Sequence, residues 1–544
     1  MSVSTGASQG RPSDPPGAPA GEPSAAPPRQ GLVLTALILA AAVANLNMEV
    51  ANVALPAIGQ AFDASQTALN LVAVGFSLGL AASVIYLGAV GDRYGRKMML
   101  MLGMACSIPA GLLAAFAPSV EVLLIARVAG GIAAGMAYPT TLAMITALWR
   151  GAARTRAIAL WSALGGALSA LGPLASGALL ESQPWRTVFL LTIPIAVVTL
   201  FLVARLVPAK VHETTEPVDH LGGTLSIVFV GALVLMINFL PVPGGGTLSL
   251  VLGVITLVTG AAFVVRQRRA AVPVYDLALA ARRPFWVAAV AGIIVFGALM
   301  GAVYVGQLFL QNVLGYSALQ AGAAILPAVA LLVAAAPVST WLVNRYGSRL
   351  PLLVGFGFCL AGFAAMLAFW DVGVGYGAVF AGYGLIGIGV GIAGTPASQA
   401  LTNSVPVHRA GMASGTADLQ RDLGGAIMQS ILGALLAAGY ASAVGAALAQ
   451  APADVRAQVT DDIRSQLQQS YAGAVSIADQ APQYRDAIVA AARESFLQGA
   501  QAAYLTGLAA TGLGALIVAV FYPGRAREIE MVAGYAREDR DASA

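Results

Sequence analysis

Long apolar runs separated by short polar segments dominate this chain. About fourteen of the runs approach or exceed the ~20 residues that a helix needs to cross the hydrocarbon core of a bilayer. Because a bilayer offers no water to backbone groups, each run is expected to form a helix. The predicted spans are residues 31–52, 68–90, 98–117, 121–148, 157–181, 187–207, 221–240, 247–265, 285–312, 319–343, 350–370, 375–402, 410–447 and 497–522. The run 410–447 is too long for the bilayer and is expected to project beyond it.

Composition also indicates an integral membrane protein. Of the 544 residues, 58% are hydrophobic and only 10% are charged, whereas a soluble domain carries about a quarter charged residues. The net charge is +4. The sequence contains no basic patch with interleaved aromatic residues, so nucleic-acid binding is not expected. Residues 1–30 are rich in Pro, Ser, Gly and Ala, so we expect a disordered tail and no signal peptide. Cys106 and Cys359 lie singly in apolar runs, which indicates neither a disulfide nor a metal site.

Basic residues in the loops predict the orientation of the spans. They gather after every second span, and the positive-inside rule assigns such loops to the cytoplasm. These residues are Arg93, Arg96, Lys97, Arg150, Arg154, Arg156, Arg205, Lys210, Arg266, Arg268, Arg269, Arg282, Arg283, Arg345, Arg349, His408, Arg409, Arg525 and Arg527. We therefore expect an even number of spans in the plasma (cell inner) membrane, with both termini cytoplasmic.

A short charged loop occurs twice. Asp92-Arg-Tyr-Gly-Arg-Lys97 follows the second span, and a degraded copy, Asn344-Arg-Tyr-Gly-Ser-Arg349, follows the tenth. Parallel repeats of this kind are typical of one transporter architecture. They predict an all-α protein of two six-helix bundles with two inserted helices. The predicted segments are a tail at 1–30, a first bundle at 31–207, a loop and inserted pair at 208–284, a second bundle at 285–522 and a cytoplasmic tail at 523–544.

One loop, 448–496, is long and is expected on the outer face. It carries acidic and basic residues in similar numbers. The stretches 453–470 and 482–496 are expected to be polar helices. A solvated extracellular cap is the favoured interpretation, and a lid that handles substrate is the alternative.

The first charged loop, from Gly88 to Lys97, resembles the loop between the second and third spans of major facilitator superfamily transporters. The matching residues are Gly88, Asp92, Arg93, Gly95, Arg96 and Lys97. The resemblance implies that they latch the inner ends of the two halves in the outward-facing state. Positive-inside topology alone would explain the bases but not the spacing of the acid and the glycines. Because Asn344 stands where the first copy has Asp92, the first copy is expected to dominate.

Two further segments resemble motifs of this superfamily. The segment Leu124–Gly135 resembles its second motif, in which the arginine, here Arg127, is linked to proton transfer; snorkelling towards the membrane surface is the alternative. The fifth span resembles the motif characteristic of the antiporters, with small-residue helix packing as the alternative. The matching residues are Gly165, Gly172, Pro173 and Gly177.

The first span holds a carboxylate on a polar face. Asn45, Glu49 and Asn52 recur at helical spacing, and an ionisable residue within a span indicates a functional site by default. The segment resembles the first-span signature of the fourteen-span drug:proton antiporters, whose typical acid aligns with Asn47. Glu49 lies two residues further on, so it points about 200° away. Glu49 is the leading candidate for the proton carrier, with Arg127 as its electrostatic partner; a place at the outer mouth is the alternative.

The thirteenth and ninth spans contain further polar residues. Asp418, Arg421 and Asp422 lie within about one helical turn, so Arg421 can neutralise only one acid. A second protonation or cation site and a neutralised cluster at the cytoplasmic interface are both open. On the ninth span Tyr304, Gln307 and Gln311 share a face. With Asn45 and Asn52 they are candidate cavity residues; interhelical hydrogen bonds or an oligomer contact would equally explain them.

Together these features predict a proton-coupled exporter of hydrophobic or amphipathic small molecules, with multidrug efflux as the leading form. No nucleotide-binding loop, catalytic triad or metal-ligand spacing occurs, so neither an enzyme nor a cofactor nor a metal is expected. The expected partners are a small-molecule substrate, protons and membrane lipid, and the expected state is a monomer. The alternatives are export of an endogenous lipid or metabolite, proton-symport import, and a receptor or scaffold without transport.

Overall fold

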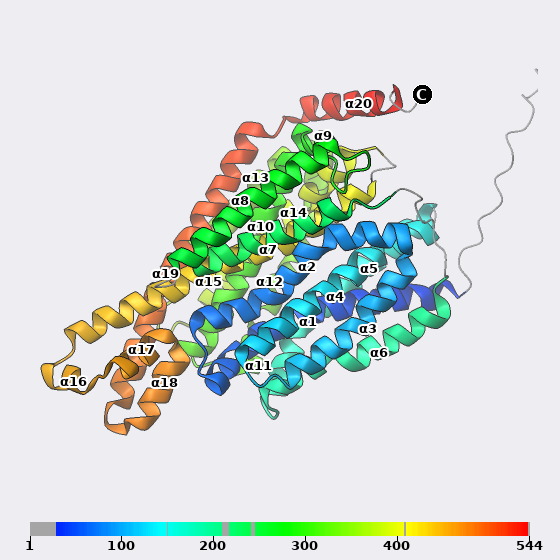
Figure 1. The fold of residues 1–544 in the computed structure, drawn as a ribbon. Helices are drawn as coiled ribbons and strands as arrows, with labels where there is room; N and C mark the ends of the chain where they lie inside the picture. The colour runs from blue at the N-terminus through cyan, green and yellow to red at the C-terminus, as the bar shows by residue number, and fades with distance from the viewer. Residues whose placement is uncertain (1–28, 150, 209–216, 241–244, 407–409, 542–544) are drawn as a thin grey trace, which may run out of the picture.

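A computed structural model describes residues 29–149, 151–208, 217–240, 245–406 and 410–541 (Figure 1). Within these ranges every regular element is a helix. Four residues of the predicted basic loops, Arg150, Lys210, His408 and Arg409, lie outside the described residues. So does nearly all of the predicted tail 1–30, and so do the side chains of Arg154 and Arg156.

The helices follow one another along the chain with short connections (Figure 1). Their bounds are α1 Gln30–Phe62, α2 Gln66–Tyr94, α3 Arg96–Ala115, α4 Val120–Leu148, α5 Gly151–Leu180, the 3-10 helix η1 Trp185–Leu190, α6 Thr192–Leu206, α7 His220–Phe239, α8 Gly246–Arg269, α9 Leu277–Ala280, α10 Arg283–Asn312, α11 Ala318–Ala324, α12 Leu326–Tyr346, α13 Arg349–Phe369, α14 Tyr376–Asn403, α15 Ala410–Gln450, α16 Ala453–Gln458, α17 Asp461–Gln469, α18 Tyr471–Gln480, the 3-10 helix η3 Pro482–Tyr484, α19 Arg485–Phe521 and α20 Arg525–Asp541.

The predicted spans reappear as helices. Among the described residues, 13 helical segments are long and apolar enough to cross a membrane. The one predicted span not among them, 157–181, coincides with α5, of which Leu171–Leu180 form the described apolar part. The prediction of an all-α membrane protein is therefore confirmed.

Two predicted limits, those of the first and last spans, are wrong by ten residues or more. The first helix does not end at 52 but continues through Pro56 to Phe62. Proline removes one backbone donor, and burial of the neighbouring Leu55 and Ile58 compensates for that loss. The last span begins at Arg485 and not at 497, because Ala492 and Phe496 on its added turns pack into the core.

The helices pack in two groups. In the first bundle (α1–α6), α4 packs against α2 and α3, and α1 packs against α5 and α6. In the second bundle (α10–α15 and α19), α10 packs against α14, α15 and α19, while α13 packs against α14 and α19. The bundles meet where α2 contacts α15, where α5 contacts α11 and where α1 contacts α10. The residue limits predicted for the bundles stay a prediction.

The inserted helices lie against the junction of the two bundles. Helix α7 packs on its partner α8 and also on α2 and α15 (Figure 1). Three buried polar residues join these elements: Asn70 Nδ2 donates to Asn238 Oδ1 at 2.5 Å, and Asn238 Nδ2 donates to Ser430 Oγ at 2.7 Å. Helix α7 of the inserted pair therefore contacts both bundles at once.

The two ends of the molecule differ. At one end, the loop-motif end, lie the turns α2–α3 and α12–α13 and the C-terminal helix α20; at the other, the cap end, lie α16–α18 (Figure 1). The prediction of one helix over 453–470 is wrong, because Thr460 caps a new helix, α17, after α16. The stretch 482–496 is helical as predicted, but it consists of η3 and the first turns of α19 and is therefore continuous with the last span.

The cap is packed onto the bundles. Leu467 and Ile477 are buried in the main core, and the Tyr440 hydroxyl donates to the Ser470 carbonyl at 3.1 Å. Helix α18 also contacts α1 of the first bundle. The favoured interpretation from sequence, a solvated cap, therefore holds only for the outer surface of α16–α18.

Candidate functional site

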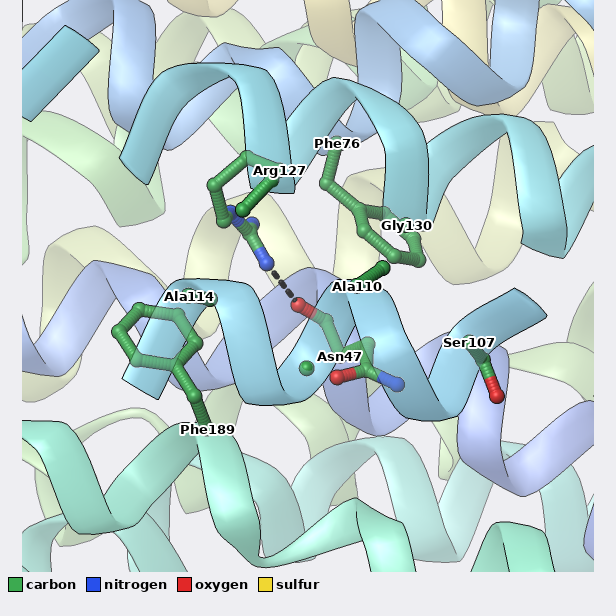
Figure 2. A pocket seen from close by; sticks show the side chains of 10 residues that line it. Asn47, Phe76, Ser107, Ala110, Ala114, Arg127, Gly130 and Phe189 are labelled. Carbon is green, nitrogen blue, oxygen red and sulfur yellow. Dashed lines mark hydrogen bonds between the residues drawn. The ribbon is translucent and has the colours of Figure 1, made fainter. Parts of the chain in front are cut away.

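Arg127 is a buried cation inside the first bundle. Its side chain is 3% exposed although it lies on a helix predicted to span the membrane. One guanidinium nitrogen donates to the Asn47 carbonyl (Figure 2), a second to the Met48 carbonyl at 3.2 Å, and Nε donates to the Val72 carbonyl at 3.3 Å. Arg127 therefore does not snorkel to the membrane surface but joins α4 to α1 and α2.

Aromatic rings and a small cavity complete the surroundings of Arg127. The guanidinium carbon lies 5.0 Å from the centre of the Phe76 ring and 6.0 Å from that of Phe189, distances at which a cation is attracted to a ring face. A cavity of about 20 Å³ lies beside Arg127, between Asn47 and Gly130 (Figure 2). That volume accommodates roughly one water molecule.

Glycines on α4 explain how Arg127 reaches its partners. A Cβ atom at Gly131 would lie 2.0 Å from the Phe76 carbonyl oxygen. Only glycine therefore allows α2 and α4 to approach this closely, as small residues do at helix interfaces in membranes. The approach brings Phe76 and the Val72 carbonyl to the guanidinium group.

Glu49 lies on α1 next to this cation. Its side chain is 7% exposed and its charge interacts with that of Arg127, although no ion pair within 4.0 Å joins the two among the described residues. Glu49 faces α5, because a Cβ atom at Gly172 would lie 3.2 Å from the Glu49 Cβ. Three predicted features, the acid of α1, the base of α4 and Gly172 of α5, therefore meet in one place.

Asn47 faces elsewhere, as the helical spacing leads one to expect. Its side-chain oxygen accepts a hydrogen bond from the Thr192 hydroxyl at 2.9 Å, and its amide donates to the Val43 carbonyl at 3.0 Å. The position at which the drug:proton antiporters typically have an acid is thus occupied by an amide directed towards α6. The carboxylate of this chain is instead directed towards α5.

The small residues of α5 also mark a contact between the bundles. A Cβ atom at Gly177 would lie 2.5 Å from the Ala318 carbonyl oxygen, and one at Gly322 would lie 2.4 Å from the Pro173 carbonyl oxygen. Helices α5 and α11 therefore meet almost backbone to backbone near the cap end. Gly165 lies about two turns before Gly172 in α5, in a part of the helix whose side-chain contacts the structure does not describe.

A second charged cluster lies on α15 towards the loop-motif end. Asp418 and Asp422 are 8% and 4% exposed. Arg421 lies between them but donates its hydrogen bond to the Tyr138 hydroxyl of α4, at 2.9 Å. The guanidinium carbon of Arg421 also lies 5.4 Å from the centre of the Phe296 ring. The cluster therefore connects the second bundle to the first.

The charges of this cluster are incompletely matched. The charge of Arg421 interacts with both acids, yet no ion pair among the described residues joins it to either of them. Asp422 Oδ2 is buried and has no hydrogen-bond partner in the described part of the chain. Two acids and one base leave one carboxylate uncompensated, which is a suitable place for a proton.

Sequence reasoning missed Tyr138. It lies eleven residues after Arg127, which is close to three helical turns, so both side chains share a face of α4. That spacing was the available signal, but nothing in the sequence pairs Tyr138 with a residue on α15. Trp161 of α5 supports the ring of Tyr138 at a centroid distance of 5.8 Å and donates to Thr141.

The candidate cavity residues of α10 make hydrogen bonds between helices. Tyr304 accepts from Gln66 Nε2 of α2 at 3.2 Å, Gln307 donates to the Ala321 carbonyl of α11, and Gln311 donates to the Val53 carbonyl of α1 at 3.1 Å. The first and third bonds cross between the bundles near the cap end. Asn52 is 2% exposed and Asn45 is partly exposed.

The predicted latch residues contact their own bundle. Asp92 accepts from Arg96 Nε at 2.8 Å, and Lys97 donates to the Ala204 and Val207 carbonyls at 2.9 and 2.8 Å. Gly95 separates α2 from α3 with φ of 126°, a conformation that favours glycine. Gly88 and Arg93 lie on the last turns of α2. No group of three or more His, Cys, Asp or Glu side chains suited to a metal occurs in the described residues.

Comparisons with known proteins agree with this architecture. Multidrug resistance protein Stp of Mycobacterium tuberculosis (strain CDC 1551 / Oshkosh) is 32% identical over 411 residues, 75% of this chain and 76% of that protein. Multidrug efflux pump LfrA of Mycolicibacterium smegmatis is 31% identical over 418 residues, 76% of this chain and 82% of that protein.

A solved structure and a family profile lead to the same fold. The crystal structure of a bacterial homologue of the human lysosomal transporter Spinster, in an inward-facing and unoccupied conformation, superposes with a TM-score of 0.63 at 16% identity. The superposition covers 90% of this chain and 97% of that one. The profile of the Major Facilitator Superfamily matches residues 37–429. The chain therefore belongs to the Major Facilitator Superfamily.

Proposed function

We propose that this chain is a proton-coupled secondary active exporter of hydrophobic or amphipathic small molecules, of the multidrug-efflux type. The observation that carries the proposal is the burial of Glu49, Arg127, Asp418 and Asp422 in helices apolar enough to span a membrane. Burying ionisable groups there is costly, and such groups generally serve ion or substrate movement. The similarity to multidrug resistance protein Stp and multidrug efflux pump LfrA supports drugs as the exported compounds.

The proposed orientation follows from the charged loops. The loop-motif end is cytoplasmic by the positive-inside rule, in a plasma membrane, and the cap end is outside. The bundles, with proposed limits 31–207 and 285–522, contact each other at the cap end through Gln66–Tyr304, Gln311–Val53 and the α5–α11 approach. We propose that these contacts close the cap end of the carrier in this conformation.

Glu49 is the proposed proton carrier. It lies nearer the cap end than the cluster on α15 and beside the cation Arg127, with whose charge it interacts. Protonation from outside would free Arg127 from its electrostatic partner and change the packing of α1 against α5. Asp418 and Asp422 form the proposed second site, nearer the cytoplasm, where Arg421 and Tyr138 join the two bundles.

The latch motif is proposed to act in the opposite half of the cycle. In this structure Asp92, Arg96 and Lys97 make their hydrogen bonds within the first bundle. When the cap end opens, the loop-motif ends must come together, and these residues would then face the second bundle. The carrier would act as a monomer, since each step uses residues of one chain.

Transport by purified protein in liposomes tests the proposal. Substrate-dependent proton movement is expected in the wild type, and Glu49→Gln should abolish proton-driven efflux while leaving the amount of folded protein unchanged. Glu494→Gln, an exposed glutamate of the cap-end part of α19, is the matched control and should transport normally. Normal coupling in Glu49→Gln would remove Glu49 from the mechanism.

The same assay separates the alternatives. Proton flux in the same direction as substrate would indicate an importer, and no substrate-dependent flux with any drug, lipid or metabolite tested would indicate a receptor or scaffold. Drug-sensitivity profiling of a deletion strain separates export of drugs from export of an endogenous lipid or metabolite.

A further inference from the structure

The C-terminal helix α20 is fastened across the loop-motif end of the second bundle (Figure 1). Arg282, just before α10, pairs with Asp539 through two bonds of 2.5 and 3.0 Å. Both side chains of this pair are largely buried, with 11% and 17% exposure. Arg282 also lies 4.5 Å from the centre of the Tyr535 ring and donates to the Ser404 carbonyl at 2.7 Å. The helix is therefore a packed part of the fold.

The same helix contacts the degraded copy of the charged loop at its other end. Glu528 Oε2 accepts from the Ser348 backbone N–H at 3.0 Å, and Glu528 Oε1 accepts from the Ser348 hydroxyl at 2.6 Å. The Tyr522 hydroxyl donates to Glu528 Oε1 at 2.9 Å. Arg525 donates to the Asn344 carbonyl at 3.2 Å.

The two loop copies share one of their contacts. In the first, Lys97 donates to carbonyls at the end of α6, the last helix of its bundle. In the second, the equivalent Arg349 donates to the Ala519 carbonyl at the end of α19, the last helix of its bundle. The base at this position therefore fastens the third helix of each bundle to the sixth.

The copies differ in the remaining charged pair. The first copy contains Asp92 and Arg96, which form an ion pair of 2.8 Å. At the equivalent positions the second copy has Asn344 and Ser348, so acid and base are both missing. Ser348, which replaces the base, is the residue to which Glu528 binds. A carboxylate is thus present in both loops, but in the second copy it comes from α20.

The backbone of the second loop is shaped for this contact. Gly347 has φ of +80°, and a Cβ atom there would lie 3.0 Å from both Glu528 Oε2 and Arg525 Cβ. Glu528 also lies at the start of α13, where the helix dipole favours a negative charge. Hydrogen bonds to an ionised carboxylate are about twice as strong as those between neutral groups.

We propose that Glu528 replaces the missing acid of the second loop copy and that α20 is a positioning element of the cytoplasmic gate. It holds the α12–α13 loop in the geometry that the loop needs when the loop-motif ends close. The gating role of α20 rests on the proposed transport function. The contact between Glu528 and the loop does not depend on that function. Contrary to the expectation from Asn344 alone, the second copy then has its own support.

Hydrogen exchange measured by mass spectrometry on the full-length protein tests the contact. Glu528→Gln should make the backbone amides of residues 345–350 and 352 exchange about tenfold faster, because a hydrogen bond to a charged group is lost. Glu530→Gln, an exposed glutamate two residues further along α20, removes the same charge and should change exchange less than about twofold. Adding Asn344→Asp and Ser348→Arg to Glu528→Gln restores the pair of the first copy and should slow exchange again.

Efflux in liposomes tests the role in gating. Glu528→Gln should lower the maximal efflux rate about tenfold while leaving the half-saturating substrate concentration unchanged, since the gate and not the substrate site is affected. The triple variant should recover the rate, which a merely damaged fold would not do. Three results would each overturn the proposal. They are unchanged exchange in Glu528→Gln, an unchanged maximal efflux rate despite faster exchange, and no recovery in the triple variant. If the wild type shows no efflux, the proposed function fails, and the loop contact is then decided by exchange alone.

Discussion

The two buried charged sites are built differently. Arg127 donates to carbonyls of α1 and α2 within the first bundle and has Glu49 beside it. Arg421 belongs to the second bundle and donates to Tyr138 of the first. The first site can change its charge without separating the bundles, whereas the second includes a bond that must change when they move. The proposed roles in proton uptake and in bundle movement can therefore be tested at different residues.

The largest effect on stability is expected at the first site, around Arg127 and Glu49. Arg127→Met leaves the buried Glu49 without its neighbouring positive charge and three carbonyls without this donor, so the free energy of unfolding should fall by about 3–5 kcal/mol. Thermal unfolding in detergent measures this loss. Arg186→Met, a partly exposed arginine near the cap end, is the control. Glu49→Gln combined with Arg127→Met should recover part of the stability but no transport; no recovery would mean that the two charges do not interact.

The next largest effect is expected at the second site, the charged cluster on α15. It concerns the coupling of efflux to the proton gradient more than stability. Asp422→Asn removes a carboxylate whose Oδ2 has no partner in the described residues, so the free energy of unfolding should change by less than about 1 kcal/mol. The stimulation of efflux by a pH gradient should fall by on the order of 100-fold, the upper range for coupling between sites. Fluorescent-substrate efflux with and without a gradient measures it. Asp418→Asn is the companion variant, and equal, normal coupling in both would exclude the cluster from proton transfer.

A smaller effect is expected from the bond between the bundles. Tyr138→Phe removes the hydrogen bond to Arg421, and bonds to charged groups contribute about 1.5–3 kcal/mol. The balance between the two bundle arrangements should therefore shift by about tenfold or more. Pulsed electron paramagnetic resonance on spin labels at the loop-motif ends measures the populations. Tyr376→Phe, an exposed tyrosine at the start of α14, should leave them unchanged.

The smallest effect is expected from a neutral contact at the cap end. Tyr304→Phe removes the bond from Gln66, and bonds between neutral groups contribute about 0.5–1.5 kcal/mol. The same spin-label measurement should show a shift of only a few fold towards the arrangement open at the cap end. A shift as large as that of Tyr138→Phe would mean that charge does not distinguish the two contacts.

Much of the fold was predictable because it depends on local composition. The apolar runs correspond to helices since a backbone in lipid must satisfy its own hydrogen bonds. The limits failed at Pro56 and at Arg485, where packing with distant residues extended a helix past its apolar run. Membership of a transporter family also confirms the prediction that the chain is not an enzyme.

The charged residues of the candidate site could be predicted from the sequence, but their contacts could not. Glu49, Arg127, Asp418 and Asp422 were recognisable because charges are rare in apolar runs. Their partners were not, since Tyr138 and the carbonyls of Asn47 and Met48 are unremarkable along the chain and acquire a role only when α1, α4 and α15 cross. Glu528 was missed for the same reason, as it lies 180 residues from Ser348.

Taken alone, the sequence determined the helical membrane architecture, the family resemblance and the repeated charged loop. These properties follow from hydropathy, charge and spacing, which are local. The tertiary structure decided which charge has which partner: Arg127 with its own bundle, Arg421 with the opposite one, and Glu528 with a loop that has lost its acid. Such pairings depend on helix crossings set by glycine contacts and buried side chains far apart in the chain, and no local pattern encodes them.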